Sequence, residues 1–209
     1  MSVTEISQRL WQAASESSWA EWIAVISGIL SVWFSKKENV LVYPVGLINT
    51  IIYTWISFVY HLPGEATVNF YYTIMSLYGW YNWMRKTDQH ETIVHIKFSD
   101  RREWITEILF FLFCYLVLFY ALTSLRDLFF EGAIPWADAL ASAAAFTGMW
   151  LMTKKKVESW YWWILTNIVS IPLYFVKGLE LTSVYYFILL LIAGSGLISW
   201  QQKARMEHA

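Results

Sequence analysis

The chain has 209 residues, of which 57% are hydrophobic, 19% aromatic and only 15% charged, with a formal net charge of −1 and a mean hydropathy of +0.41. This composition is too apolar and too aromatic for an ordinary soluble domain. The single cysteine, Cys114, excludes a disulfide framework and a thiolate metal site, and the four histidines show no metal-ligand spacing. We therefore expect neither a cofactor nor a nucleic-acid partner.

Residues 1–20 form a first predicted element, a short amphipathic helix. Val3, Ile6, Leu10 and Ala14 lie along one side of this helix, with polar residues opposite. The segment has neither a basic start nor a long apolar centre, so it does not resemble a cleaved signal peptide. We expect it to lie in the interface of the bilayer.

Seven apolar segments follow, and most approach the roughly 20 residues needed to cross a bilayer. They cover residues 21–35, 40–60, 67–84, 104–123, 136–152, 159–176 and 181–200. The predicted fold class is therefore an all-α membrane protein with seven transmembrane helices, and the lipid bilayer is its first partner.

Basic residues are distributed unevenly between the two sets of loops. One side collects 12 of the 15 Lys and Arg residues, which are Lys36, Lys37, Arg85, Lys86, Lys97, Arg101, Arg102, Lys154, Lys155, Lys156, Lys203 and Arg205. The other side has only Arg9, Arg126 and Lys177. Because basic loops remain in the cytoplasm, we expect the N-terminus outside and the C-terminus inside.

An internal repeat accounts for the odd number of helices. At an offset of 118 residues, Ser35-Lys36-Lys37 aligns with residues 153–155 and Asn49 with Asn167, and after a four-residue gap Tyr71-Tyr72 aligns with residues 185–186. We therefore predict two parallel three-helix repeats, residues 21–84 and 136–200. The cytoplasmic loop 85–103 and a linker helix with its outer loop, 104–135, join them, and 201–209 is a cytoplasmic tail. The predicted layout is 3+1+3.

A polar face lies inside the sixth apolar segment. Trp163, Asn167, Ser170 and Tyr174 follow one another at i, i+4, i+7 and i+11, so they share one face of a helix. A buried amide needs hydrogen-bond partners, because leaving it unpaired costs about a few kcal/mol. Two interpretations stay open: this face binds a neighbouring helix, or it binds a ligand. Asn49, at the repeat-related position, favours a ligand.

Further polar and aromatic residues on neighbouring helices are expected to converge on the same space. The candidate site residues are Trp163, Asn167, Asn49, Tyr53, Asn69, Tyr72, Trp80, Asp138 and Ser170. The alternative for a single Tyr or Trp is packing or a position in the interface belt. Together they describe an almost uncharged, aromatic and amide-rich pocket that suits a small planar polar solute, with Asp138 near its mouth favouring cations.

The apolar segments lack the groups that other function classes need. The middle of the pocket helices holds no ionisable residue for ion coupling, and no nucleotide-binding motif is present, so a uniporter is the simplest transporter. A retinal protein would need a Lys in the last helix, and Leu181–Trp200 has none. An intramembrane enzyme would need a His or paired carboxylates within the helices. We therefore expect a transporter, with a heptahelical receptor as a remote alternative.

Three motifs carry a resemblance to a known family. The stretches 43–49 (YPVGLIN), 79–83 (GWYNW) and 160–163 (WYWW), the last followed by Asn167, resemble the PnuC family of nicotinamide riboside transporters over nearly the whole chain. The resemblance implies a SWEET-like fold, a homotrimer and the bacterial inner membrane. It also implies facilitated diffusion of nicotinamide riboside, which a cytosolic riboside kinase then traps by phosphorylation.

The same resemblance implies residue roles. Trp163 and Asn167 match the motif residues that contact substrate, and Asn49 is their counterpart in the first half. Nicotinamide riboside is a cationic pyridinium joined to a ribose, so aromatic rings would attract it by cation–π contacts worth roughly 0.5–2 kcal/mol. Relatives that carry thiamine share these motifs, so a related vitamin such as thiamine is the alternative substrate.

Overall fold

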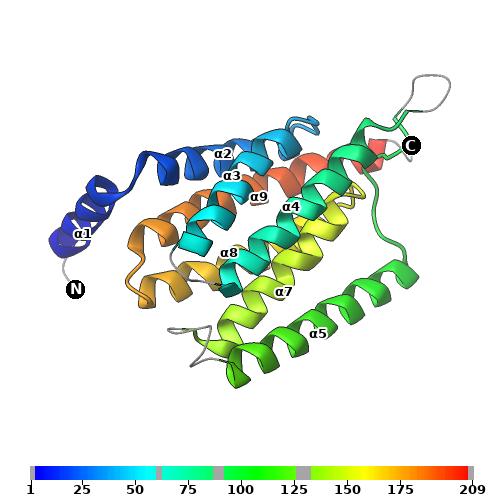
Figure 1. Cartoon of the computed structure of the whole chain (residues 1–209). Coiled ribbons are helices and arrows are strands. Elements are labelled where there is room, and N and C mark those ends of the chain that lie inside the picture. The colour runs from blue at the N-terminus through cyan, green and yellow to red at the C-terminus, as the bar shows by residue number, and fades with distance from the viewer. Residues whose placement is uncertain (1–2, 60–62, 87–91, 126–132, 207–209) are drawn as a thin grey trace.

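A computed structural model describes residues 3–59, 63–86, 92–125 and 133–206. Within these ranges the chain forms eight helices (Figure 1). They are α1 (Val3–Glu16), α2 (Trp19–Lys36), α3 (Val42–Val59), α4 (Pro63–Met84), α5 (Arg101–Ser124), α7 (Pro135–Met152), α8 (Ser159–Val176) and α9 (Glu180–Met206). A helix therefore occupies each of the seven predicted apolar segments and the N-terminal segment. Arg126 and the side chains of Val3 and Ile6 lie outside the described part.

Local sequence signals set several of the helix ends. Ser18 and Glu21 form a capping box at the start of α2, in which each side chain accepts a hydrogen bond from the other residue's backbone N–H. Asp100 and Glu103 form the same motif at the start of α5. Gly178 follows α8 with φ of +75°, a conformation that glycine adopts without strain. These signals end or begin the long apolar helices at short polar turns.

Length and apolarity single out a subset of the described helices as candidate membrane spans. Arg101–Ser124 and Glu180–Met206 qualify alone, and Ser7–Glu16 with Trp19–Lys36 qualifies as a pair bent by 110°. The other described helices do not meet the combined criterion of length and apolarity. Two or three spans can thus be assigned on this basis.

The helices pack as two consecutive trios. Within the first, α2 contacts α3 and α3 contacts α4; within the second, α7 contacts α8 and α8 contacts α9 (Figure 1). Between the trios, α2 contacts α9 and α4 contacts α7, so exchanging the trios leaves this set of contacts unchanged. Helix α5 packs on α7, and Arg9 of α1 pairs with Glu180 of α9 at 3.2 Å.

Aromatic contacts recur in both trios at an offset of 117 residues. The rings of Tyr43 and Trp83 meet edge to face with centroids 5.2 Å apart and an interplanar angle of 88°. The rings of Trp160 and Trp200 do the same at 5.5 Å and 90°. Each pair joins the second helix of a trio to the third, so equivalent side chains hold equivalent helices together.

The hydrogen bonds of two of these indoles obey the same offset but cross from one trio to the other. Trp83 Nε1 donates to the carbonyl of Met152, the last residue of α7, at 3.2 Å. Trp200 Nε1 donates to the carbonyl of Ser35, in the last turn of α2, at 3.2 Å. Both acceptors are helix-end carbonyls that lack a partner within their own helix.

These contacts correct the alignment of the two halves. The offset predicted from the sequence was 118 residues, with a four-residue gap later on. In the structure, residue 43 is equivalent to residue 160, 79 to 196 and 83 to 200. This is an offset of 117 residues without a gap. Asn49 is therefore equivalent to Thr166, and Asn167 to Thr50. The Asn–Asn match was wrong by one residue because two identical residue types lie one position out of register.

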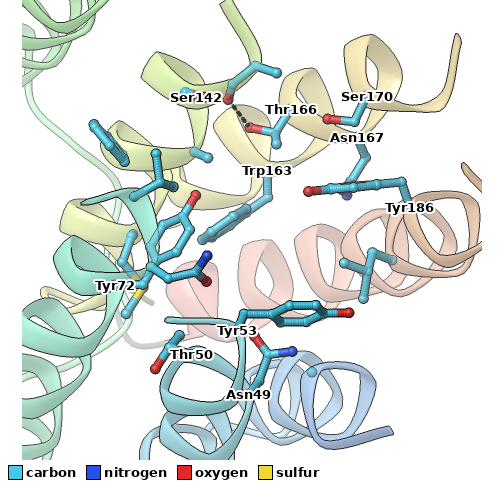
Figure 2. A pocket seen from close by; sticks show the side chains of 18 of the residues that line it. Asn49, Thr50, Tyr53, Tyr72, Ser142, Trp163, Thr166, Asn167, Ser170 and Tyr186 are labelled. Atoms are coloured by element: carbon cyan, nitrogen blue, oxygen red, sulfur yellow. Dashed lines mark hydrogen bonds between the residues drawn. The ribbon is translucent and has the colours of Figure 1, made fainter. Parts of the chain in front are cut away.

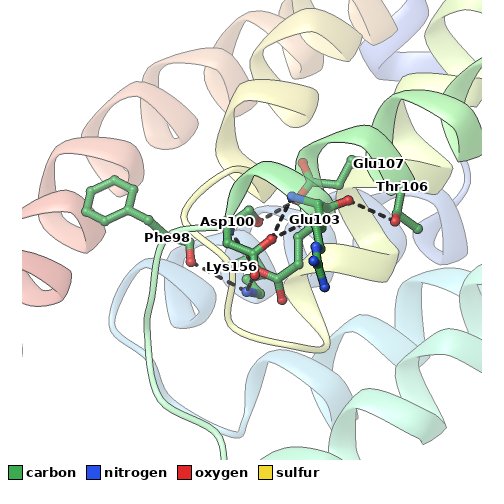
Figure 3. Close-up of polar contacts among 8 residues, drawn as sticks. Phe98, Asp100, Glu103, Thr106, Glu107 and Lys156 are labelled. Carbon is green, nitrogen blue, oxygen red and sulfur yellow. Dashed lines mark hydrogen bonds and ion pairs between the residues drawn. The ribbon is translucent and has the colours of Figure 1, made fainter.

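Ion pairs join the basic loops at one end of the molecule. Glu38, which follows α2, accepts from Lys155 Nζ at 2.8 Å and from Lys203 Nζ at 2.9 Å. Lys156 pairs with Glu103 and also approaches the Phe98 carbonyl, which ties the turn between α7 and α8 to the start of α5 (Figure 3). The lysine-rich loops thus form one connected end of the structure, which we call the lysine-rich end.

The close packing of these rings predicts which glycines tolerate a side chain. A Cβ at Gly79 would lie 2.4 Å from the Tyr43 ring, and one at Gly196 would lie 2.6 Å from the Trp160 ring. We expect Gly79→Ala and Gly196→Ala each to destabilise the protein by about 1–3 kcal/mol, because a filled core has to shift. Thermal unfolding of the purified variants measures this.

Gly194, two residues away on the same helix, is the matched control. A Cβ there would meet nothing within 4 Å. Gly194→Ala should be neutral or stabilise the protein by up to about 1 kcal/mol, because alanine favours helix. Equal losses at Gly194 and Gly196 would contradict this packing.

Candidate ligand-binding site

A cavity of about 810 Å³ lies between the two helix trios (Figure 2). All six helices of the trios and the C-terminal half of α5 contribute lining residues. The cavity reaches from Lys177 and Leu179 at one end to Ser35 and Met152 at the lysine-rich end. Its size falls within the range of pockets that enclose small-molecule ligands.

The structure brings together all but one of the candidate residues predicted from the sequence. Those that line the cavity are Asn49, Tyr53, Asn69, Tyr72, Asp138, Trp163, Asn167 and Ser170. The exception is Trp80, which packs against the buried aromatic cluster of Tyr43, Trp83, Trp160 and Trp200. Ser76 lines the cavity, and Trp80 lies one helical turn further along α4, beyond the end of the cavity.

The two asparagines differ in what their amides bind. Asn49 Nδ2 donates to the carbonyl of Ala24 on α2 at 2.7 Å, so this amide joins two helices. Thr166, its equivalent, donates to the carbonyl of Ala141 on α7 at 3.3 Å. Asn167 is only 2% exposed, yet no residue in the described ranges hydrogen-bonds its side chain. A buried amide that faces a cavity without a protein partner is available for a ligand.

Trp163 lies one turn before Asn167 and faces the same cavity. Its indole rests on Gly148 of α7, where an added Cβ would lie 3.2 Å from the ring. The Tyr72 ring lies beside it, with centroids 6.4 Å apart (Figure 2). The equivalent position in the first trio is Gly46, which also lines the cavity. Only one of two related positions therefore carries an indole, and the cavity is asymmetric.

Tyr185, near the start of α9, is a cavity residue that was missed in the sequence. Tyr185 and Tyr186 both line the cavity, and the Tyr186 ring stacks on Tyr174 with centroids 5.2 Å apart and an angle of 9°. Gly28 of α2 gives the Tyr185 hydroxyl room, because a Cβ there would lie 2.3 Å from it.

Asp138 and Lys177 are the charged residues among the described lining of the cavity. Lys177 Nζ lies 2.7 and 2.9 Å from the two carboxylate oxygens of Asp138, and the Ile134 backbone N–H donates to the same carboxylate at 2.6 Å. The carboxylate that was expected to favour cations at the cavity mouth is therefore paired with a lysine. Lys177 neutralises the carboxylate, which leaves the cavity without a net charge.

Comparison with known proteins assigns this chain to a family. The profile described as nicotinamide mononucleotide transporter matches residues 18–202. The nicotinamide riboside transporter PnuC of Escherichia coli (strain K12) is 27% identical, over 90% of this chain and 87% of that protein. The riboflavin/roseoflavin transporter RibM of Streptomyces davaonensis is 25% identical over the same shares.

A solved structure has the same fold. The crystal structure of the vitamin B3 transporter PnuC matches with a TM-score of 0.71 at 24% identity, over 96% of this chain and 90% of that one. The fold match and a family match over most of the chain therefore agree. This chain belongs to the nicotinamide mononucleotide transporter family, the family of PnuC, and is a multi-pass membrane protein of a transporter family, not an enzyme family.

Proposed function

We propose that this protein is a uniporter for nicotinamide riboside. The observation that carries the proposal is the pair formed by Trp163 and Asn167: an indole without a counterpart in the other trio, next to a buried amide without a protein partner. An indole attracts a pyridinium ring, and an amide pairs with a hydroxyl or a carboxamide. Nicotinamide riboside presents all three groups.

The charge of the cavity favours an unphosphorylated ligand. Recognition of a phosphate requires Lys, Arg or a cluster of N–H donors. The one cation in the described lining, Lys177, is already paired with Asp138. A riboside therefore fits better than the mononucleotide after which the family is described. PnuC relatives are described as transporters of the riboside, which supports the same choice.

Riboflavin is the second candidate, because the relative RibM covers as much of this chain as PnuC does. The stacked Tyr174 and Tyr186 rings offer a flat aromatic wall for a larger ring system. Thiamine stays an alternative that rests on the motif resemblance. All three carry a planar aromatic ring and no phosphate, so binding assays have to distinguish them.

We further propose that transport is uncoupled. The described cavity residues include no ionisable group free to carry a coupling ion, because Asp138 and Lys177 bind each other. Net uptake then requires that the product be removed inside the cell. The cytosolic riboside kinase and the homotrimer stay predictions drawn from the resemblance.

The architecture that we propose is seven transmembrane helices in a 3+1+3 layout. Contacts repeated at an offset of 117 residues support two parallel repeats, α2–α4 and α7–α9, and α5 packs outside them as the linker. Helix α1 would lie in the membrane interface, where its exposed Trp11, and the exposed Trp19 at the start of α2, suit the headgroup region.

The lysine-rich end is proposed to face the cytoplasm. Glu38, Lys155, Lys203 and Lys156 connect these basic loops directly, so they lie on one side. A reporter that is active only in the cytoplasm should be active when fused after Ala209 and inactive when fused before Met1. Activity at both ends would contradict an odd number of crossings.

Substitutions at Trp163 and Asn167 test the proposed substrate site. Trp163→Ala removes the aromatic surface and should weaken nicotinamide riboside binding by about five- to thirtyfold, equal to roughly 1–2 kcal/mol. Asn167→Leu should cost a similar factor without lowering the thermal stability, because Asn167 has no protein partner within the described chain. Binding of radiolabelled nicotinamide riboside, thiamine and riboflavin to purified protein provides the measurement.

Asn49→Leu is the contrasting variant. It removes the bond to the Ala24 carbonyl, so it should lower the stability by about 1 kcal/mol. The proposal fails if both Trp163→Ala and Asn167→Leu bind the riboside as the native protein does. Tighter binding of riboflavin than of the riboside would select the second candidate.

The paired charges predict a switch in selectivity between nucleoside and nucleotide. Asp138→Asn frees the Lys177 ammonium and should raise the affinity for nicotinamide mononucleotide relative to the riboside by about tenfold. Lys177→Gln frees the carboxylate and should change this ratio in the opposite direction. Competition binding with the two ligands measures the ratio. The double variant restores neutrality and should return the ratio to the native value; a shift of the same sign in both single variants would refute the idea.

A further inference from the structure

We propose that Tyr43, Trp83, Trp160 and Trp200 form the gate that closes the substrate cavity toward the lysine-rich end. We call these four residues the aromatic quartet. The proposal goes beyond the transport function proposed above and rests on it. It assigns to the quartet the step at which a bound solute passes between the two helix trios.

The quartet forms the floor of the cavity. Tyr43 and Trp160 line the cavity and are 1% and 0% exposed, so they close it at the lysine-rich end. Trp83 and Trp200 pack behind them and meet each other with centroids 6.1 Å apart. A solute as large as a nucleoside has no path through four buried rings at normal packing density. The floor has to open for transport toward this end.

The bonds that hold the floor closed run from one trio to the other. Trp83 of α4 donates to the Met152 carbonyl of α7, and Trp200 of α9 donates to the Ser35 carbonyl of α2. Moving the trios apart at this end breaks both bonds together. The two bonds are equivalent under the 117-residue offset. The floor can therefore open by moving one trio away from the other as a rigid unit, without bending either trio.

An ion-pair group lies directly behind the floor. Lys155 Nζ binds Glu38 and lies 4.9 Å from the centroid of the Trp83 ring. Burial alone would raise the pKa of the Glu38 carboxyl, but hydrogen bonds and charge from Lys155 and Lys203 outweigh it and keep that pKa below its ordinary value. The Lys155–Glu38 pair also joins the two trios, so it belongs to the same closure.

Two unpaired polar atoms lower the stability of the closed floor. Tyr43 Oη and Trp160 Nε1 are both buried without a hydrogen-bond partner among the described residues, at positions 117 residues apart. A buried polar group without a partner costs free energy. Water or a passing solute would supply the missing partners when the floor opens. This cost lowers the difference between the closed and open states, as a gate requires.

Labelling of a thiol inside the cavity from one side of the membrane tests the gate. The test protein carries Cys114→Ser, which removes the native cysteine, and Ser142→Cys, which places a thiol in the cavity lining. A membrane-impermeant thiol reagent is added to vesicles of known sidedness. With the native quartet, labelling from the lysine-rich side should be slow.

Two phenylalanine substitutions remove the N–H donors that cross between the trios, together with part of each ring. Trp83→Phe and Trp200→Phe should each raise the labelling rate from the lysine-rich side by about fivefold, and by similar factors because their bonds are equivalent. Trp136→Phe, at an indole that is 60% exposed and outside the quartet, is the matched control and should leave the rate unchanged.

Tyr43→Phe gives a result of opposite sign. It removes an unpaired hydroxyl and keeps the ring, so it should stabilise the closed floor and slow labelling from the lysine-rich side. This variant keeps the test informative if the tryptophan variants do not fold. The proposal is overturned if Tyr43→Phe and the folded tryptophan variants all label at the native rate, or if Trp136→Phe labels as fast as Trp200→Phe.

The labelling does not use substrate, so the two proposals fail separately. Altered labelling together with absent riboside binding would remove the proposed substrate and keep the gate. Native labelling in every quartet variant, together with normal riboside transport, would remove the gate and keep the substrate.

Discussion

A polar side chain that faces the centre of these apolar helices needs a hydrogen-bond partner, because neither lipid nor aliphatic side chains provide one. Asn49 and Thr166 meet this need with backbone carbonyls of the preceding helix, and in doing so they hold α3 on α2 and α8 on α7. Asn167 lies one residue after Thr166 and therefore points away from that contact, into the cavity. The side chains that hold helices together and the amide left for a ligand are thus set apart by helix geometry alone.

The two trios share one backbone arrangement, but their equivalent positions carry similar side chains in some places and different ones in others. At the lysine-rich end the equivalent positions carry similar side chains, since Tyr43 and Trp160 are both large rings and Trp83 and Trp200 are both indoles. In the cavity the equivalent positions differ, as Gly46 and Trp163 do. The side chains of the aromatic quartet therefore follow the symmetry of the repeat, whereas Gly46 and Trp163 depart from it.

Much of the fold follows from the apolar runs, because a helix is the structure that satisfies its own backbone in an apolar surrounding. The register and the electrostatics were harder to predict. The alignment of Asn49 with Asn167 looked convincing, but one residue of shift rotates a helix by 100° and changes which neighbour a side chain meets. Trp80 shares a helix face with Ser76, and spacing alone does not tell where along that face a cavity ends. The neutralisation of Asp138 by Lys177 joins residues 39 positions apart and required the packed structure.

Symmetry and asymmetry have different physical uses in such a molecule. A gate between two rigid trios opens most simply when its contacts lie in equivalent pairs, because one relative movement breaks them together. A binding site for a solute with a ring at one end and hydroxyls at the other gains nothing from equivalent walls, since the two ends require different partners. Trp163 opposite Gly46 provides one wall for a ring and leaves space for that ring to occupy. A duplicated three-helix unit can therefore change its cavity residues one at a time while the contacts that join the two units are preserved.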